Sequence, residues 1–120
     1  KSITIACNGV CVAQSLLAAE KLAAEGIDAE VINFHTIKPF DKEALVASAK
    51  KTNRVFTVEE HSIIGGLGGA ACEALADEYP TKVTRIGVND VFGQSGDAAT
   101  LLVKYGLDSE GIYKKIKESL

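Results

Sequence analysis

Short runs rich in β-branched residues alternate with helical patterns along most of the chain, and this alternation constrains the fold more than any other feature. The runs read SITIAC, AEVINFHTI, RVFTV and KVTRIGV, at residues 2–7, 29–37, 54–58 and 82–88. The first run is mostly apolar at both its odd and its even positions, which is typical of a strand buried on both faces. Strands separated by helices predict a parallel sheet covered by helices on both faces, an α/β fold of three α/β/α layers. Right-handed crossovers favour a doubly wound sheet in the order 2-1-3-4.

The segments between these runs have the apolar spacing of helices. Residues 10–25 form the first helical pattern, which Gly26 ends. Its predicted inward face consists of Val12, Leu16, Ala19, Leu22 and Ala23. Asp41 is expected to cap a second helix that runs to about Lys51, and a third helix is expected at 66–79.

The last part of the chain follows a different pattern. A loop of turn-forming residues precedes a short helix expected from about Asp97 to Tyr105. A final helix is expected to begin at Asp108 or Ser109, with Ile112, Ile116 and Leu120 on its apolar face. No internal repeat or low-complexity linker interrupts the 120 residues, so the chain is expected to form one domain, 1–120.

The overall charge and the cysteines exclude several classes of function. The formal net charge is −3, which argues against nucleic acid or an anionic membrane as a partner. The three cysteines form no CxxC pair, and with only two histidines the chain has no zinc-site spacing. Reduced cysteines packed as small apolar residues, in a cytoplasmic protein, are the expected arrangement.

The predicted sheet order places a crevice between the first and third strands, where such folds bind ligands at the carboxyl ends of the strands. The candidate crevice and interface loop comes from the two segments that follow these strands. Its residues are Asn8, Gly9, Glu59, Glu60, His61, Ser62, Gly65, Gly66 and Gly68.

The glycine-rich stretch EEHSIIGGLGGAACEAL, from residue 59, permits a nucleotide-binding interpretation. Gly66, Gly68 and Ala71 fit G-x-G-x-x-G/A at the start of a helix. However, the six residues EEHSII separate Val58 from the first glycine, two of them are carboxylates that would repel a pyrophosphate, and no Walker lysine occurs. Packing is therefore the favoured role of the glycines.

A catalytic role for His61 beside two acids is the other functional interpretation of this stretch. No nucleophile elbow or metal motif accompanies the histidine, so no catalytic, cofactor-binding or metal-binding residue is assigned, and His35 is expected to be structural. We expect residues 59–62 to form an exposed turn facing a partner. We also expect the carboxylate of Glu59 or Glu60 to interact with the N–H groups at the start of the following helix.

Four stretches resemble the C-terminal domain of transketolase-type, thiamine diphosphate-dependent enzymes. They are VINFHTIKPFD, VFTVEEHSIIGGLGGAACEAL, IGVNDVFGQSG and LLVKYGLDSEGIYKKI, which occur in the family's order and span most of the chain. The tail is most similar to transketolase, especially to forms split into two subunits. The related alternatives are 1-deoxy-D-xylulose-5-phosphate synthase and the beta subunits of 2-oxo acid dehydrogenases.

The resemblance implies that the chain is a fragment of a longer parent enzyme, with a further antiparallel strand just upstream of Lys1. The parent would bind thiamine diphosphate with Mg²⁺ or Ca²⁺ in other domains and transfer two-carbon ketol units between sugar phosphates. This domain would supply non-catalytic structure and dimer contacts to other domains or subunits of a homodimeric or larger transketolase. An alternative from a different functional class is a stand-alone regulatory module that binds a nucleotide or a small molecule.

Overall fold

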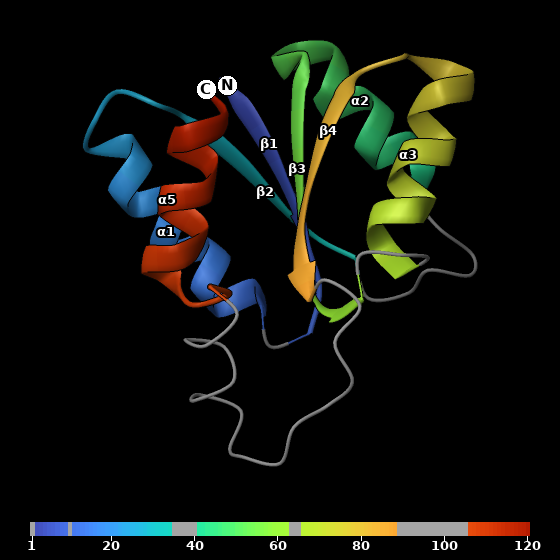
Figure 1. Ribbon diagram of the computed structural model, residues 1–120. Coiled ribbons are helices and arrows are strands. Elements are labelled where there is room, and N and C mark those ends of the chain that lie inside the picture. The colour runs from blue at the N-terminus through green and yellow to red at the C-terminus, as the bar shows by residue number, and fades with distance from the viewer. Residues whose placement is uncertain (1, 10, 35–40, 63–65, 89–105) are drawn as a thin grey trace.

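A parallel sheet of four strands forms the middle layer of the computed structural model (Figure 1). The structure describes residues 2–9, 11–34, 41–62, 66–88 and 106–120. The strands are β1 (Ile3–Cys7), β2 (Ala29–Asn33), β3 (Arg54–Ser62) and β4 (Lys82–Val88). Their order is β2-β1-β3-β4 and every pair is parallel, which confirms the doubly wound order.

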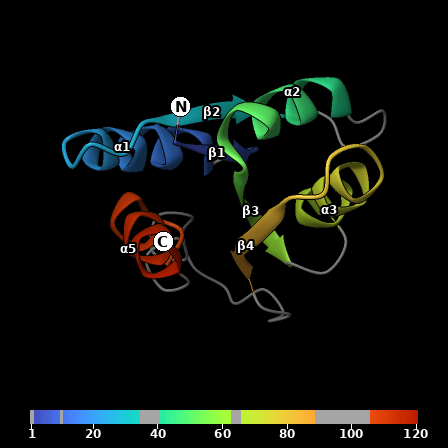
Figure 2. The same cartoon turned by 90° about the horizontal axis from the view of Figure 1, so that it is seen from above.

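Two pairs of helices cover the two faces of the sheet. Helices α1 (Cys11–Ala23) and α5 (Ser109–Ser119) lie on one face, and α2 (Lys42–Thr52) and α3 (Gly66–Glu78) lie on the other (Figures 1 and 2). The three-layer α/β/α architecture predicted from the alternation of strands and helices is therefore confirmed.

The sheet divides the hydrophobic core into two halves. All five residues of β1 are buried, and their side chains alternate between the two halves. The half under α1 and α5 contains Phe56, the largest fully buried side chain among the described residues, with Ile112 and Ile116 from α5 packed in the same cluster. The half under α2 and α3 contains Val55, Leu45 and Leu75. A core on both faces of a central strand is what the doubly apolar first run predicts.

The ends of α2 follow from its flanking residues. The Asp41 side chain accepts a hydrogen bond from the Ala44 N–H at 3.2 Å, so the predicted N-cap is confirmed. At the other end Asn53 adopts a left-handed conformation with φ of 57°, and its N–H donates to the Ala49 carbonyl at 2.7 Å.

Three sequence predictions about the elements need correction. Leu16, at 51%, and Ala23 are exposed, because α1 turns the stripe of Cys11, Ser15, Ala18 and Leu22 inward. Leu120 is 57% exposed, because α5 ends before it. The second strand ends at Asn33, short of the predicted 29–37, although residues 35–37 lie outside the described part. The short helix predicted at 97–105 also lies outside the described residues.

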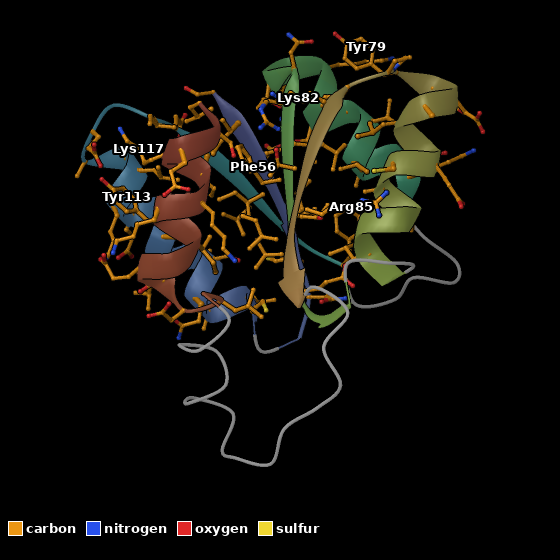
Figure 3. All side chains as sticks on the ribbon, in the orientation of Figure 1. Phe56, Tyr79, Lys82, Arg85, Tyr113 and Lys117 are labelled. Carbon is orange, nitrogen blue, oxygen red and sulfur yellow. The ribbon has the colours of Figure 1, made fainter. Side chains whose placement is uncertain are left out.

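Polar contacts join α5 to α1 and to Glu25, which follows α1. The Ser109 N–H donates to Gln14 Oε1 at 2.8 Å, and Lys21 pairs with Glu110. Lys117 Nζ donates to Glu25 at 3.0 Å, and the Tyr113 hydroxyl also donates to Glu25. Tyr113 and Lys117 project from α5 on the side of α1 (Figure 3). The last helix is thus held by both its apolar stripe and its charges.

The Glu25 contact makes the α1–α5 junction sensitive to acid. The hydrogen bonds from Tyr113 and then Lys117 lower the pKa of Glu25 from its ordinary value. A lowered carboxyl pKa in the folded state contributes stability above the unfolded-state pKa, and this contribution is lost as the pH falls through the folded-state pKa. We therefore expect Glu25→Gln to reduce the free energy of unfolding at neutral pH but to have little effect in acid.

Urea unfolding of the wild type and Glu25→Gln, followed by circular dichroism across the acid range, measures this difference. The matched control is Glu20→Gln, which removes the same charge from an exposed position of α1. An equal loss in both variants, or a loss independent of pH, would contradict the assignment.

Candidate functional site

The carboxyl ends of β1 and β3 lie side by side at the centre of the sheet, as the strand order requires. Cys7 of β1 pairs in register with Val58 of β3. Asn8 and Gly9 follow β1 directly and form the entry turn of α1: the Cys11 N–H donates to the Asn8 carbonyl, and the Val12 N–H donates to the Gly9 carbonyl, both at 3.2 Å. At the predicted crevice, the backbone carbonyls of Asn8 and Gly9 therefore already accept hydrogen bonds from the first turn of α1.

The strand β3 continues four residues beyond its predicted end. Residues 59–62 belong to it, with a register irregularity against β4 between Val58 and Ser62. The prediction of an exposed turn at 59–62 is wrong, because all four residues belong to the strand and Glu59 is only 2% exposed. Strand alternation explains this burial: Val55, Thr57 and Glu59 share the parity that faces α3.

The buried carboxylate of Glu59 lies against the start of α3. Its Oε2 accepts a hydrogen bond from the Gly68 N–H at 2.8 Å. The first N–H groups of a helix have no partner within the helix, and the helix dipole adds partial positive charge there. The prediction that a carboxylate of this segment interacts with the N–H groups at the start of the following helix is confirmed, and the residue is Glu59.

This contact fills the position at which a bound phosphate would approach the glycines. A phosphate at the N-terminus of α3 would compete with Glu59 for the same N–H group and would bring two negative charges together inside the protein. The described residues therefore do not fit a diphosphate site at this end of the sheet, and the nucleotide interpretation of the glycines loses its main support.

The glycines of this segment differ in what they do. Gly66 has φ of +52°, a conformation that favours glycine, and it lies against the Glu59 carboxylate. A Cβ at Gly68 would stand 2.9 Å from Arg85 Cδ and 3.3 Å from Thr57 Oγ1. Among the described residues, none outside α3 itself and the chain neighbours of Gly69 brings an atom within 4 Å of a Cβ built at Gly69, so the described packing does not require a glycine there.

Two neighbours of this contact carry polar atoms that the sequence alone did not single out. The Thr57 hydroxyl is buried, and no residue in the described part of the chain bonds to it. Arg85 packs its side chain beside Gly68 and donates from Nη2 to Cys72 Sγ at 3.3 Å. The period-2 pattern of β3 and β4 is the signal that could have placed Thr57 and Arg85 beside α3.

Cys7 lies at the end of β1 but is not suited to act as a nucleophile. Burial raises the pKa of its thiol to about 11, and the Ser15 hydroxyl opposes this only in part. The thiol donates to the Ile32 carbonyl at 3.5 Å. Cys11 is also buried, and all three cysteines are free thiols. Cys7 and Cys11 are therefore packed as small apolar residues, as the sequence predicted.

Several predictions about the candidate loop lie outside the described part of the chain. Gly65 and His35 fall in undescribed segments, as do the side chains of Glu60, His61 and Ser62, so their roles stay predictions. Within the described residues, no group of three or more His, Cys, Asp or Glu side chains could hold a metal ion. In that same part of the chain, no helix has the length and apolarity needed to cross a membrane.

The close approach at Gly68 leads to a test of packing. Gly68→Val is expected to lower the free energy of unfolding by about 1–3 kcal/mol, because the new side chain meets Thr57 and the stem of Arg85. Chemical denaturation measures the loss. Combining Gly68→Val with Arg85→Ala should recover part of it, since the arginine stem is then absent. A Gly68→Val protein as stable as the wild type would contradict the packing role.

Comparison with known proteins identifies the family. A family model described as "Transketolase, C-terminal domain" matches residues 1–112. The chain is 49% identical to "6-deoxy-6-sulfo-D-fructose transketolase subunit SqwH" of Clostridium sp. (strain MSTE9), over 97% of this chain and 36% of that protein. It is 41% identical to 1-deoxy-D-xylulose-5-phosphate synthase of Syntrophotalea carbinolica, over 91% of this chain and 17% of that protein.

Comparison with a solved structure indicates the same family as these sequence relatives. The chain superposes with a TM-score of 0.91 and 47% identity on a protein described as "Split gene transketolase, inactive beta4 tetramer", covering 98% of this chain and 39% of that one. The chain thus spans little more than a third of the transketolase relatives that it matches. The sheet order, the glycine-rich start of α3 and these matches place the chain in the transketolase C-terminal domain family.

Proposed function

We propose that this chain is a non-catalytic structural domain of a thiamine diphosphate-dependent transketolase. In this role it supports subunit contacts while other domains or a partner subunit bind thiamine diphosphate and its divalent metal ion. The whole enzyme would transfer two-carbon ketol units between sugar phosphates in the cytoplasm, as a homodimer or larger assembly. Relatives named as a transketolase subunit and as a split-gene tetramer favour such a shared assembly.

The observation that carries the non-catalytic role is the contact between Glu59 and Gly68. In a doubly wound sheet the ligand site is expected at the carboxyl ends of the central strands. Here the Glu59 carboxylate, 2% exposed, holds the N-terminus of α3 at that point. The chain's own acid takes the place that a diphosphate would need, which supports placing the cofactor in another part of the enzyme.

A second candidate is the same structural role within a 1-deoxy-D-xylulose-5-phosphate synthase. The identity of 41% to such an enzyme favours it, although that relative shares only 17% of its length with this chain. The two candidates differ in the reaction of the whole enzyme and not in the role of this domain. The alternative from a different functional class is a stand-alone module that binds a nucleotide or a small molecule. The hydrogen bond between Glu59 and Gly68 argues against nucleotide binding at the start of α3.

Two measurements test the proposal. Calorimetric titration of the chain with thiamine diphosphate and Mg²⁺ should show only heats of dilution, whereas saturable binding would refute the non-catalytic role. Mixing the chain with the cofactor-binding portion of its enzyme should give a complex that co-elutes on size exclusion and gains ketol-transferase activity. Absence of both the complex and the gain would refute the assembly role. Formation of 1-deoxy-D-xylulose 5-phosphate in place of ketol transfer would select the second candidate.

A further inference from the structure

Helix α1 presents an exposed outer face that is almost without charge, in the layer that it shares with α5 (Figure 2). The residues of this outer face are Ala13, Leu16, Leu17, Glu20 and Ala23, and all but one of them are apolar. They recur at spacings of three and four, which places them opposite the buried residues of the helix. Leu16 and Leu17 are 51% and 46% exposed, and Leu120 is the one other exposed large apolar side chain among the described residues.

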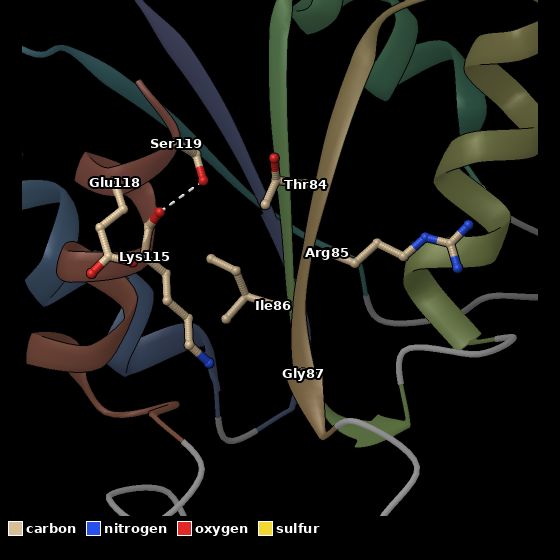
Figure 4. A pocket seen from close by; sticks show the side chains of 7 residues that line it. All are labelled: Thr84, Arg85, Ile86, Gly87, Lys115, Glu118 and Ser119. Carbon is tan, nitrogen blue, oxygen red and sulfur yellow. Dashed lines mark hydrogen bonds between the residues drawn. The ribbon is translucent and has the colours of Figure 1, made fainter.

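The neighbouring helix shows that this composition is particular to α1. The exposed positions of α5 are Glu110, Lys114, Lys117 and Glu118, and each of them is charged. The groove of about 320 Å³ between α5 and β4 is also lined mainly by polar residues, among them Lys115, Glu118 and Ser119 (Figure 4). Apolar residues that gather on one exposed face mark a contact with another molecule. The outer face of α1 therefore has the composition of an interface.

The electrostatic character of the outer face differs between its two ends. Glu20, its one charged residue, lies towards the C-terminal end of α1. The first turn, from Cys11 to Gln14, contains no acidic residue, so no carboxylate of that turn offsets the partial positive charge of the helix N-terminus. The outer face is thus positive at its start, apolar in the middle and negative near its end.

A surface with this arrangement is complementary to itself. A two-fold rotation with its axis beside Leu16 and Leu17 packs two α1 helices antiparallel and sets each leucine next to the same leucine of the second copy. Glu20 and Ala13 lie on opposite sides of this axis, each about one turn away. Glu20 of each copy therefore meets the first turn of the other copy, where the helix dipole favours a negative charge. The small side chain of Ala13 permits close approach of the two helices.

We propose that the outer face of α1 is a contact between two copies of this chain, formed by antiparallel packing of their α1 helices about a two-fold axis. This pairing rests on the proposed role in subunit contacts and names one of the surfaces involved. One pair of helices about 20 Å long, at 1.5 Å per residue, covers less than the roughly 1,200–2,000 Å² that stable complexes bury. The pairing is therefore weak in isolation and acts together with other contacts of the whole enzyme.

Self-association of the chain over a range of concentrations tests this surface. We expect sedimentation velocity to show a reversible monomer–dimer equilibrium, with the dimer populated at high micromolar concentration. Leu16→Gln combined with Leu17→Gln should weaken the dimer by about tenfold or more, and the exposure of both positions lets the fold persist. Leu120→Gln removes a similarly exposed leucine outside the outer face and should have no effect. A wild type that stays monomeric up to about 1 mM, or equal losses in both variants, would overturn the pairing.

Charge reversal tests the antiparallel orientation. Glu20→Lys should weaken the dimer by about tenfold, because its contact with a helix N-terminus occurs twice and becomes repulsive. Glu73→Lys makes the same change of net charge at an exposed position of α3 and should leave the dimer unchanged. An equal effect of the two reversals would show that Glu20 does not lie at the contact.

Disulfide formation between two copies locates the axis. The background is Cys72→Ser, which removes the one free thiol of the three that is not buried. Leu17→Cys should form a disulfide-linked dimer under mild oxidation, because its two copies lie beside the axis. Ala23→Cys should not, because its two copies lie about 20 Å apart along the antiparallel helices. Linkage through residue 23 in preference to residue 17 would reject this arrangement.

Binding to the rest of the enzyme separates a failure of this pairing from a failure of the proposed function. The variant with Leu16→Gln and Leu17→Gln should still co-elute with the cofactor-binding portion of the enzyme. If the variant loses that complex but keeps its self-association, the outer face binds the cofactor-binding portion, and the pairing is wrong while the proposed function stands. A wild type that forms that complex but never dimerises would lead to the same conclusion.

Discussion

Glu59→Ala is expected to lower the free energy of unfolding by about 2–3 kcal/mol, because it leaves the Gly68 N–H buried without its charged acceptor. The substitution also removes a side chain that is only 2% exposed, so the surrounding residues lose packing contacts. Chemical denaturation with a two-state fit measures the difference. A Glu59→Ala protein as stable as the wild type would show that the contact at the start of α3 contributes nothing.

The isosteric variant separates charge from hydrogen bonding at this position. Glu59→Gln keeps an oxygen that can accept from Gly68 but loses the interaction of a negative charge with the helix N-terminus, which is worth about 0.3–1 kcal/mol or more when buried. We expect its stability to fall between those of the wild type and Glu59→Ala. Formate should stabilise Glu59→Ala more than the wild type at equal ionic strength, because it can replace the missing carboxylate. An equal effect on both proteins would contradict that replacement.

Gly66→Ala is expected to be the most damaging of the single-methyl changes in this segment, with a loss of about 3 kcal/mol. The left-handed backbone at φ of +52° costs about 1–2 kcal/mol for an L-residue. The new Cβ also overlaps the position of the Glu59 carboxylate, so that the side chain must move, and such overpacking adds about 1–3 kcal/mol. Thermal and urea unfolding of the variant give the loss.

Gly69→Ala provides the matched control three residues further along α3. A Cβ there meets no atom of the packed residues that the structure describes within 4 Å, and alanine is the better helix former by about 0.5–1 kcal/mol. The control should therefore be as stable as the wild type or more stable. If Gly66→Ala and Gly69→Ala change stability alike, the carboxylate does not lie against Gly66 as the structure indicates.

The sequence was sufficient for the sheet order because the signal for each strand was local and strong. The run before Asn8 is apolar at both parities, and this pattern alone indicates a central strand. The Asp41 cap and the Ile112–Ile116 stripe of α5 were also predictable, since capping and helical spacing depend on neighbouring residues.

The end of β3 could not be found in the same way. Two adjacent carboxylates and a histidine favour a loop on composition, whereas the strand continues through a register irregularity until Ser62 pairs with Val88 of β4. The choice between Glu59 and Glu60 as the acid at α3 stayed open for the same reason. Continuing the alternation from Val55 through Thr57 would have selected Glu59, but only if the strand was known to continue.

Leu16 shows a second limit of local patterns. Helix α1 is rich in apolar residues on several faces, so more than one stripe could have been buried. The position of β1 under the helix decides in favour of Cys11, Ser15, Ala18 and Leu22. That position depends on tertiary contacts, above all on α5, which follows α1 at a large distance in the sequence.

The two halves of the core differ in how much of the chain must be present before they can close. The half under α2 and α3 is built from residues between Ala6 and Val83. The half under α1 needs Leu107, Ile112 and Ile116, and its Gln14–Ser109 hydrogen bond joins residues 95 positions apart. Loop closure over such a separation costs more conformational entropy than the local contacts of α2 and α3. We expect a nascent chain to assemble the α2–α3 side first and to leave α1 uncovered until α5 has been made.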